Sequence, residues 1–395
     1  MTKEEKVEEI LTRGAAEVIH LEVLREKLLS GKKLRIKFGI DPTSPNIHIG
    51  RATTLWKLRE LQDLGHTIIF IIGDFTAVIG DTSDKESERP MLTREEVERN
   101  MATYFEQAGK ILDMNKVEKH YNSEWLEKLT YREIGEHADT FSVSDFISRD
   151  NIKRRLDQGK RVSLREVLYP LMQGYDSVAV KADVEIGGTD QKFNILAGRT
   201  LQTHFKQEPQ NIILLDLIEG LDGRKMSSSW GNTISLTDPA KDMFIKVMRL
   251  RDEFIVKYFI HATRVPISVA NEAQAALERG ENPRDVKLSL AEEIVSMYFS
   301  KEEAARAREA TVFLLKKRGV PDDVLEIKFE KKLLMDIFVQ QKIVSSKSEW
   351  RRLVKEGAVV RFNREGAEEK ITDELEVAQL GDAYKIGRRG YTKLI

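Results

Sequence analysis

Cysteine is absent from the 395 residues of the chain. Without it there can be no disulfide and no thiolate zinc site, and the composition suits a reducing cytoplasm. The seven histidines are scattered and none stands in an HExxH pattern, so no protein-bound metal is expected. There is no run of eighteen apolar residues, and the charged start MTKEEKVEEILTRG does not resemble a targeting signal. We therefore expect a cytoplasmic protein that does not span a membrane.

The net charge is also small, at −1, and alone it does not suggest a nucleic-acid partner. Its distribution is uneven, because Lys331–Ile395 contains 14 Lys or Arg residues against 10 Asp or Glu residues, a local charge of +4. A basic segment of this kind is a candidate contact for the phosphate groups of RNA.

Apolar runs predict a parallel sheet in the first part of the chain. LRIKFGI (34–40) is typical of a strand, 51–64 of a helix that ends at Gly65, and HTIIFIIG (66–73) of a strand buried on both faces. A strand–helix–strand order predicts parallel pairing. NIILLDLI (211–218) is a further buried strand.

Most other segments predict helices. We expect them over 4–29 with a break at Gly14, over 93–112 with a cap at Thr93, over 125–175 and over 238–320, before short strands around a helix at SEWRRLVKEG. The fold class is therefore α/β: a Rossmann-like parallel-sheet domain, an all-helical domain and a small α+β module. The expected ranges are 1–32 for an N-terminal helical segment, 33–234 for the sheet domain, 235–328 for the helical domain and 331–395 for the module.

The loop DPTSPNIHIGR (41–51) lies where the first strand gives way to a helix. Ligands of open parallel sheets bind at this edge, and the N-terminus of a helix there attracts phosphate. His48 could donate to a phosphate oxygen, and Gly50 removes bulk where a flat base could press on the helix. Walker A and GxGxxG patterns are absent from the chain. Taken alone, one histidine and one glycine could equally be ordinary loop residues.

A second loop, KMSSS (225–229), follows the NIILLDLI strand. Lys225 and the three serines supply a positive charge and hydroxyl donors, as a departing pyrophosphate requires. Serine-rich loops are often only solvated linkers, but here two such loops follow two buried strands of one sheet.

Tyr169, Gln173 and Asp176 stand at i, i+4 and i+7 in the stretch VLYPLMQGYDSV. On a helix they share one face, where a purely structural stripe would carry Leu or Val. In EIGGTDQ (185–191), a tight turn into a helix is expected, and its glycine pair would let the backbone approach a ligand closely. A glycine pair before a helix is also ordinary loop chemistry.

Together, HIGR and KMSSS resemble the HIGH and KMSKS signatures of class I aminoacyl-tRNA synthetases. KFGIDPT, IGDTSDKESER, YPLMQGYD and EIGGTDQ are similar to segments of the bacterial tyrosyl-tRNA synthetases, and the resemblance covers nearly the whole chain. It implies activation of L-tyrosine with ATP, accompanied by Mg²⁺, and transfer of tyrosine to tRNA(Tyr). It also implies a homodimer.

The resemblance assigns roles to residues of three groups. The implied catalytic residues are Thr43, His48, Lys85, Arg89, Lys225, Ser228 and Ser229. The implied tyrosine-binding residues are Gly39, Asp81, Tyr169, Gln173, Asp176 and Gln191. The implied ATP-binding residues are Asp41, His48, Gly50, Arg51, Gly188, Asp190 and Lys225.

Three positions depart from the family pattern. Arg51 replaces the last histidine of HIGH and Ser228 the lysine of KMSKS, whose charge Lys85 and Arg89 could supply. Lys37 stands where many bacterial relatives carry a second tyrosine that reaches the phenol. Asp176 should then carry more of the phenol recognition, with Asn122 as a candidate helper; the likeness is to the subgroup that lacks this tyrosine.

The C-terminal stretch QQKIVSSKSEWRRLVKEGAVVRFNREG resembles a small RNA-binding module found in a ribosomal protein and at the end of many bacterial tyrosyl enzymes. The implied RNA-binding residues are Lys347, Arg351, Arg352, Lys355, Arg388 and Arg389. A solvated basic helix is the alternative.

Two rival functions remain open from the sequence. One is a tryptophanyl-tRNA synthetase, a near relative whose strand–loop usually reads GxxPSG, where this chain has GIDPT. The other is a synthetase-derived RNA-binding protein whose catalysis is impaired by Arg51 and Ser228.

Overall fold

The structure is a computed structural model that describes residues 1–81, 91–317, 324–363, 368–387 and 390–395. Lys85, Arg89, Arg388 and Arg389 therefore lie outside the described residues. The chain forms two compact units, Met1–Ala304 and Ala305–Ile395, and each is described by itself. Within the described ranges, no helix has the length and apolar character needed to cross a membrane.

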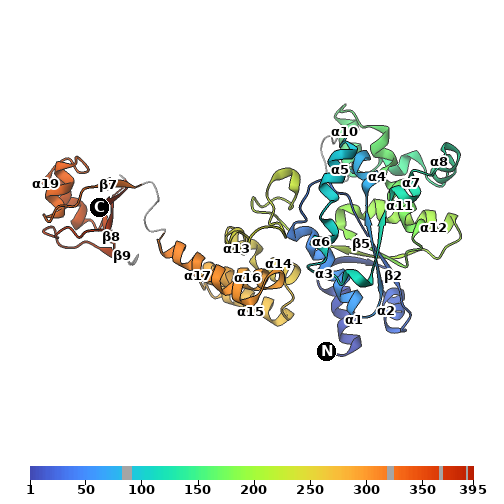
Figure 1. The fold of residues 1–395 in the computed structure, drawn as a ribbon, viewed down its shortest axis with the longest axis horizontal. Coiled ribbons are helices and arrows are strands. Elements are labelled where there is room, and N and C mark those ends of the chain that lie inside the picture. Colours follow the sequence, from blue (N-terminus) through green and yellow to red (C-terminus); the bar gives the residue numbers. More distant parts are fainter. Residues whose placement is uncertain (82–90, 318–323, 364–367, 388–389) are drawn as a thin grey trace. The chain divides into compact units, whose positions relative to one another are not determined.

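A six-stranded sheet organises the first unit (Figure 1), in the order β1-β6-β5-β2-β3-β4. Its strands are β1 (Ala15–Ile19), β2 (Arg35–Ile40), β3 (Thr67–Ile72), β4 (Val117–Tyr121), β5 (Val184–Gly188) and β6 (Asn211–Leu215). All neighbours pair in parallel except β1, which is antiparallel to β6. The sheet confirms the predicted parallel α/β class.

Helices pack on both faces of this sheet (Figure 1). Helix α3 (Ile49–Asp63) connects β2 to β3, whereas α12 (Lys192–His204) connects β5 to β6 in the opposite direction along the sheet. The direction in which successive strands are added to the sheet thus reverses between β2 and β5, which are themselves parallel. Ligands of open α/β sheets bind at the carboxyl ends of strands beside such a point.

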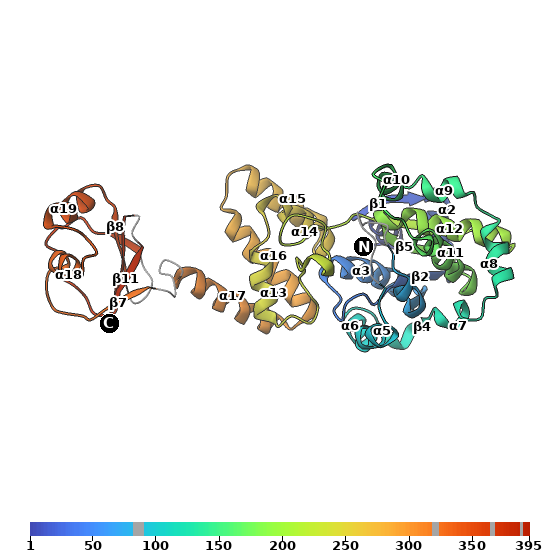
Figure 2. The ribbon, with the colours of Figure 1, turned by 90° about the horizontal axis from the view of Figure 1, so that it is seen from above.

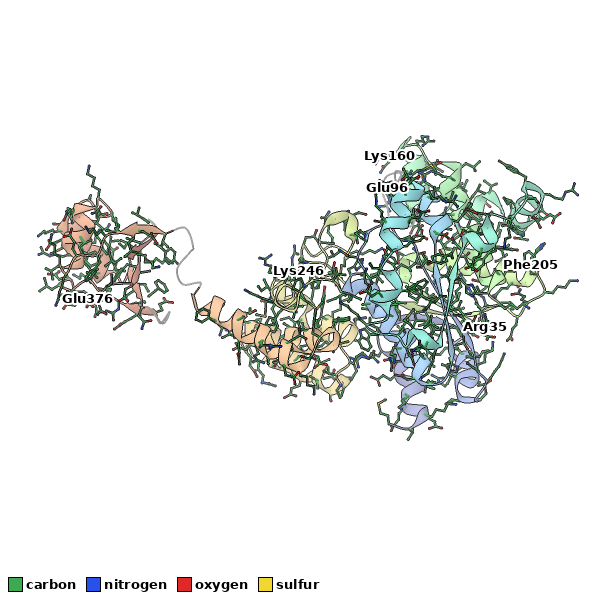
Figure 3. The ribbon with its side chains drawn as sticks, in the orientation of Figure 1. Arg35, Glu96, Lys160, Phe205, Lys246 and Glu376 are labelled. Carbon is green, nitrogen blue, oxygen red and sulfur yellow. The ribbon has the colours of Figure 1, made fainter. Side chains whose placement is uncertain are left out.

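The other helices before the C-terminal block are mostly short. They are α1 (Lys3–Thr12), α2 (Leu21–Leu29), α4 (Asp74–Ile79), α5 (Arg94–Met101), α6 (Tyr104–Ala108), α7 (Ser123–Leu126), α8 (Tyr131–Ala138), α9 (Val143–Ile147), α10 (Asp150–Asp157) and α11 (Leu164–Ala179). Single turns of 3-10 helix are η1 (Met114–Lys116), η2 (Thr189–Gln191), η3 (Ser228–Trp230) and η4 (Asp252–Phe254). Thr93 caps α5, as predicted, and forms a capping box with Glu96. Glu96 is labelled in Figure 3.

Several sequence expectations need correction. The segment 1–32 is not helical throughout, because the left-handed Gly14 (φ +67°) turns the chain into edge strand β1. The expected helix over 93–112 is divided into α5 and α6, where Gln107 of α6 hydrogen-bonds the loop residues Pro45 and Ile47. Residues 185–188 belong to strand β5, which pairs along its length with β6 and at its start with β2, so the turn into helix α12 is confined to η2.

A helical block closes the first unit. It contains α13 (Ala240–Met248), α14 (Ile255–Ala262), α15 (Ile267–Glu278) and α16 (Pro283–Tyr298), and α17 (Lys301–Lys317) begins there and continues into the second unit. Lys246 of α13, which is labelled in Figure 3, pairs with Asp238 at 2.7 Å. The buried Arg13 donates to the carbonyls of Phe259 and Thr263, which anchors the end of α14 to the N-terminal segment.

The second unit is a small α+β module (Figure 2). Its sheet has the order β7-β11-β10-β8-β9. Its elements are β7 (Leu325–Ile327), α18 (Leu334–Gln340), α19 (Lys347–Lys355), β8 (Val359–Phe362), β9 (Glu368–Lys370), β10 (Ala383–Ile386) and β11 (Tyr391–Leu394). Phe338, Trp350 and Tyr384 pack in its core. Strand β7, in the range expected to be helical, pairs with β11.

Candidate active site

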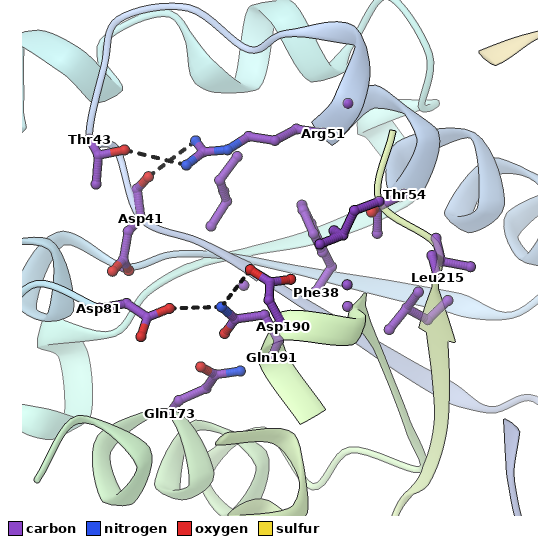
Figure 4. Close-up of a pocket in the computed structure, with 18 of the residues that line it drawn as sticks. Phe38, Asp41, Thr43, Arg51, Thr54, Asp81, Gln173, Asp190, Gln191 and Leu215 are labelled. Atoms are coloured by element: carbon purple, nitrogen blue, oxygen red, sulfur yellow. Dashed lines mark hydrogen bonds between the residues drawn. The ribbon is translucent and has the colours of Figure 1, made fainter. Parts of the chain in front are cut away.

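A cavity of about 220 Å³ lies at the carboxyl ends of β2, β3, β5 and β6 (Figure 4). Every described residue that the sequence assigned to catalysis, tyrosine or ATP lines it. These residues are Gly39, Asp41, Thr43, His48, Gly50, Arg51, Asp81, Tyr169, Gln173, Asp176, Gly188, Asp190, Gln191, Lys225, Ser228 and Ser229. The strand–loop positions therefore converge as the parallel sheet requires, and Lys85 and Arg89 lie outside the described residues.

One wall of the cavity is the polar face of helix α11. Ser163 and Glu166 form a capping box at its start. The hydroxyl of Tyr169 donates to Asp41 Oδ2 at 2.8 Å, and Thr76 Oγ1 donates to Asp41 Oδ1 at 2.7 Å. Burial and the Asp41 carboxylate raise the pKa of Tyr169 well above its usual value, so the phenol keeps its proton. These two hydrogen bonds hold the Asp41 carboxylate in place at the start of the loop that precedes helix α3.

Asp176 is a buried acid at the base of the cavity. Trp125 Nε1 donates to its Oδ1 at 2.8 Å, and Asn122 Nδ2 reaches its Oδ2 at 3.4 Å. Burial raises the pKa of Asp176 to about 7, against the opposing effects of the Lys37 charge and these two hydrogen bonds. The two donors leave further lone pairs of the carboxylate available to a hydroxyl group of a ligand.

His48 stands at the start of helix α3, where its backbone carbonyl accepts from Ala52. Burial first, then the charges of Arg51 and Lys225, lower the pKa of His48 to about 3, so its imidazole is neutral at pH 7. Its Nδ1 is buried and has no hydrogen-bond partner within the described part of the chain. A neutral imidazole with an unpaired nitrogen can contact a polar ligand group without carrying charge.

Gly50 is needed for close packing on the second loop. A Cβ built there would lie 3.1 Å from His48 Nδ1 and 3.4 Å from Met226 Cβ. The Gly50 amide faces Met226 Sδ at 3.3 Å. The glycine therefore lets the helix start and the KMSSS loop approach each other beside the cavity.

The KMSSS loop carries its lysine into the cavity. Lys225 Nζ pairs with Asp190 Oδ2 at 2.8 Å, and Asn232 holds the loop by accepting from the Ser227 amide and donating to the Lys225 carbonyl. Ser228 Oγ accepts from Ser44 Oγ at 3.0 Å. The lysine expected for the phosphates thus pairs with the acid expected for the ribose.

Arg51 points toward the loop that precedes its own helix (Figure 4). Its guanidinium donates to Thr43 Oγ1 and to the Asp41 carbonyl, both at 3.3 Å. The same figure shows Gln191 donating to Asp81 Oδ2, at 2.7 Å. No group of three or more His, Cys, Asp or Glu side chains arranged to hold a metal ion occurs among the described residues.

Comparison with known proteins gives the family. The model of the class I tRNA synthetases for tryptophan and tyrosine (W and Y) matches residues 29–316. The chain belongs to this class I tRNA synthetase family. It is 45% identical over 363 residues to a tyrosine–tRNA ligase of Thermotoga maritima, which covers 91% of this chain and 90% of the relative. A tyrosine–tRNA ligase of Carboxydothermus hydrogenoformans is 43% identical over 98% of this chain and 97% of its own.

Solved structures share the synthetase fold. A truncated mitochondrial tyrosyl-tRNA synthetase of Aspergillus nidulans superposes with a TM-score of 0.64 at 21% identity, over 78% of this chain and 94% of that one. A tyrosyl-tRNA synthetase of Archaeoglobus fulgidus, complexed with L-tyrosine, gives 0.60 at 24% identity, over 78% and 100%. The resemblance inferred from HIGR and KMSSS is thus confirmed at the level of the family.

Sequence reasoning missed two neighbours of the site. Trp125 and Thr76 hydrogen-bond Asp176 and Asp41. A tryptophan in YNSEW could have been noticed, because a buried indole N–H usually finds an acceptor. Thr76 gives no signal of its own.

The predicted RNA-binding residues of helix α19 lie on an exposed surface of the second unit. Lys347 pairs with Asp336 at 2.8 Å, Arg351 with Glu374 at 3.4 Å and Arg352 with Glu356 at 3.0 Å. Trp350 and Leu353, on the opposite side of the helix, are buried.

Proposed function

We propose that the chain is a tyrosine–tRNA ligase. It activates L-tyrosine with ATP to form tyrosyl-adenylate and pyrophosphate, and then transfers tyrosine to the 3′ end of tRNA(Tyr). The observation that carries the specificity is the buried Asp176, held by Trp125 at the base of a cavity between the two signature loops. Full-length similarity to tyrosine–tRNA ligases supports the same activity.

Tyrosine would be recognised at both ends. Asp176 accepts the phenolic hydroxyl, and phenylalanine would leave this buried acceptor unpaired, so the site rejects it. Tyr169, Gln173 and Asp81 surround the ammonium. Gly39 leaves open space at the wall of the cavity, since a Cβ there would meet nothing within 4 Å. Gln191 lies near the reacting carboxylate.

ATP would lie against the strand ends and the two loops. Asp41, Gly50, Gly188 and Asp190 face the nucleoside; a Cβ on Gly188 would come within 2.7 Å of Leu217 Cδ2 and narrow this space. Arg51 meets the phosphates or ribose. Mg²⁺ arrives with the nucleotide.

Catalysis needs alignment more than proton transfer. The tyrosine carboxylate attacks the α-phosphorus, and the bond to pyrophosphate breaks. Because the carboxylate is already a nucleophile, no general base is required. Thr43 and the neutral His48 donate to the β- and γ-phosphates, and Lys225 with Ser228 and Ser229 stabilises the departing charge. Lys85 and Arg89 are proposed to assist.

The partners follow from the surfaces. Helix α19 would contact tRNA phosphates through Lys347, Arg351, Arg352 and Lys355, with Arg388 and Arg389, and the block 235–328 would face the anticodon. Large apolar side chains are exposed on the consecutive helices α8 to α11, where Tyr131, Val143 and Leu164 are 95%, 74% and 71% accessible. Exposed apolar side chains of this size suit contact with a second copy of the chain, so we infer a homodimer, in the cytoplasm.

ATP–pyrophosphate exchange tests the activity. Purified full chain is incubated with ATP, Mg²⁺ and labelled pyrophosphate, with tyrosine, tryptophan, phenylalanine or no amino acid. Exchange with tyrosine, followed by charging of tRNA(Tyr), is expected. Exchange with tryptophan would favour the tryptophanyl alternative, and no exchange with any amino acid would favour a catalytically impaired RNA-binding protein; the named relatives favour neither.

A further inference from the structure

A buried ion pair lies at the wall of the cavity, where Glu185 is a lining residue and Lys37 lies behind it. Lys37 on β2 and Glu185 on β5 are direct cross-strand neighbours, with Nζ–Oε1 at 2.9 Å and side chains 0% and 3% exposed. Taking two charges out of water is costly, and an apolar pair of similar size is often at least as stable. The packing of the sheet does not require a charged pair at this position. Its role is therefore inferred from the specific hydrogen bonds that the two side chains make.

The ammonium of Lys37 is fully used. It donates to Glu185, to Ser177 Oγ at 2.8 Å and to the main-chain carbonyl of Gln173 at 2.9 Å. A lysine has three donors, and all three of Lys37 have acceptors. Lys37 thereby connects strands β2 and β5 to Gln173 and Ser177 of helix α11.

Glu185 fixes the side chain of Gln173. Gln173 Nε2 donates to Glu185 Oε1 at 3.3 Å, while Glu185 Oε2 accepts from Ser177 Oγ at 3.0 Å and Gln210 Nε2 at 2.5 Å. An ionised carboxylate only accepts hydrogen bonds. The amino group of Gln173 must therefore turn to Glu185, which leaves its amide oxygen for the cavity that Gln173 lines (Figure 4).

Lys37 also places a positive charge near Asp176. The Lys37 charge is the largest influence that opposes burial, which raises the pKa of Asp176 to about 7. The two ends of the tyrosine site, Gln173 and Asp176, thus share one buried charge pair.

We propose that Lys37 and Glu185 are positioning residues for tyrosine: the pair turns the Gln173 amide so that its oxygen faces the substrate ammonium. This inference rests on the proposed tyrosine–tRNA ligase activity. Neither residue touches the reacting atoms. Without the pair, the amide could turn its amino group to the ammonium, and two donors would then face each other.

The test compares two variants in tyrosine-dependent exchange. In Glu185→Gln, Lys37 keeps the new amide oxygen on its own side, so Gln173 retains its acceptor and the KM for tyrosine should stay within about threefold. In the double variant Lys37→Met with Glu185→Gln, the amide oxygen at position 185 turns to accept from Gln210, and its amino group faces Gln173. The side-chain amide of Gln173 must then reverse, so that its oxygen accepts from this amino group. The KM for tyrosine should then rise roughly 10- to 100-fold, with kcat and the KM for ATP nearly unchanged.

A ligand without the ammonium isolates the effect. Loss of Lys37 also reaches Asp176, and binding of 3-(4-hydroxyphenyl)propanoate, which keeps the phenol, measures that part separately. In the double variant this binding should weaken much less than binding of tyrosine. A control is Lys57→Met with Glu60→Gln, which removes a largely buried pair on α3 (5% and 14% exposed) away from the cavity, together with the charge that Glu60 offers to Arg264. It should change the thermal midpoint without changing the KM for tyrosine.

Two results would overturn the inference alone: a wild-type KM for tyrosine in the folded double variant, or a tenfold rise already in Glu185→Gln. If the double variant does not fold, the single variant Glu185→Gln still tests the inference, because a tenfold rise in its KM for tyrosine would overturn it. A wild-type chain without tyrosine-dependent exchange would instead remove the proposed function, and this inference with it.

Discussion

The polar residues of the cavity and those of helix α19 show how burial changes the value of a charge. Asp176, Lys37 and Glu185 are almost inaccessible, and described partners hold each of them. On α19, Lys347, Arg351 and Arg352 are more than half exposed, and each pairs directly with an acid at the surface. Removing a buried partner leaves another group unpaired, whereas water replaces a partner at the surface. Single changes should therefore be large in the cavity and small on the helix.

The largest effect is expected from Lys225→Ala. This change removes the charge that meets the departing pyrophosphate, and loss of one such contact typically costs roughly 100- to 1,000-fold in rate. The rate of tyrosyl-adenylate formation in single turnover should fall by this factor, while the dissociation constant for tyrosine stays nearly the same. Lys116→Ala, an exposed lysine that does not line the cavity, is the matched control. Collapse of tyrosine affinity would contradict the role given to Lys225.

Trp125→Phe should have the next largest effect. It keeps the aromatic shape but removes the N–H that donates to Asp176 at 2.8 Å. Hydrogen bonds to charged groups are worth enough to raise the KM for tyrosine roughly 10-fold or more. The control is Trp56→Phe, whose N–H donates to Tyr298 and not to the cavity. An equal rise in both variants would indicate a general loss of packing.

Asp176→Asn should weaken the recognition of tyrosine and, at high pH, increase the free energy of unfolding. Because burial raises the pKa of Asp176 to about 7, the folded chain holds a proton between about pH 4 and pH 7 that the unfolded chain has released. Asp176 therefore favours folding less as the pH rises toward 7. Without the buried charge, the variant should be more stable than wild type by roughly 1 to 3 kcal/mol at pH 8. Urea unfolding at pH 5, 6.5 and 8 should show the difference shrinking as the pH falls; a constant difference would contradict the assigned cause.

The smallest effect is expected on α19. Arg352→Ala should weaken binding of tRNA(Tyr) to the full chain only a few-fold, and reduce the slope of log affinity against log salt by about 1. Glu356→Gln releases Arg352 from its pair and should act in the opposite direction. Filter binding at several salt concentrations measures both. If Arg352→Ala lowered the affinity for tRNA(Tyr) by more than about 30-fold, independent of salt, the expected difference between the buried and the exposed charges would be contradicted.

The sequence reveals the strands that are apolar on both faces and the loops that follow them. HTIIFIIG contains the buried strand β3, and NIILLDLI contains the buried strand β6, which ends at Leu215. The loops after parallel strands must meet at one edge. Edge strands escaped prediction, because β1 and β4 (VEKHY) are only partly buried and carry no strong alternation.

Contacts between side chains on neighbouring strands could not be predicted from the sequence either. Lys37 was noticed only as a departure from a family pattern; its pair with Glu185 needs the register of β2 against β5, which links residues 148 positions apart. The same holds for Trp125, whose indole meets Asp176 from another element. Local patterns fix which residues face a cavity, but contacts between distant segments decide their charge and orientation.

The most direct test of tyrosine selection by the buried acid is the ratio of kcat/KM for tyrosine over phenylalanine in pyrophosphate exchange, in wild type and in Asp176→Ala. The wild-type chain should prefer tyrosine by several orders of magnitude, since phenylalanine leaves a buried acceptor unpaired. The variant should lose most of this preference, chiefly through slower reaction of tyrosine. A ratio that stays at the wild-type value in Asp176→Ala would contradict the account.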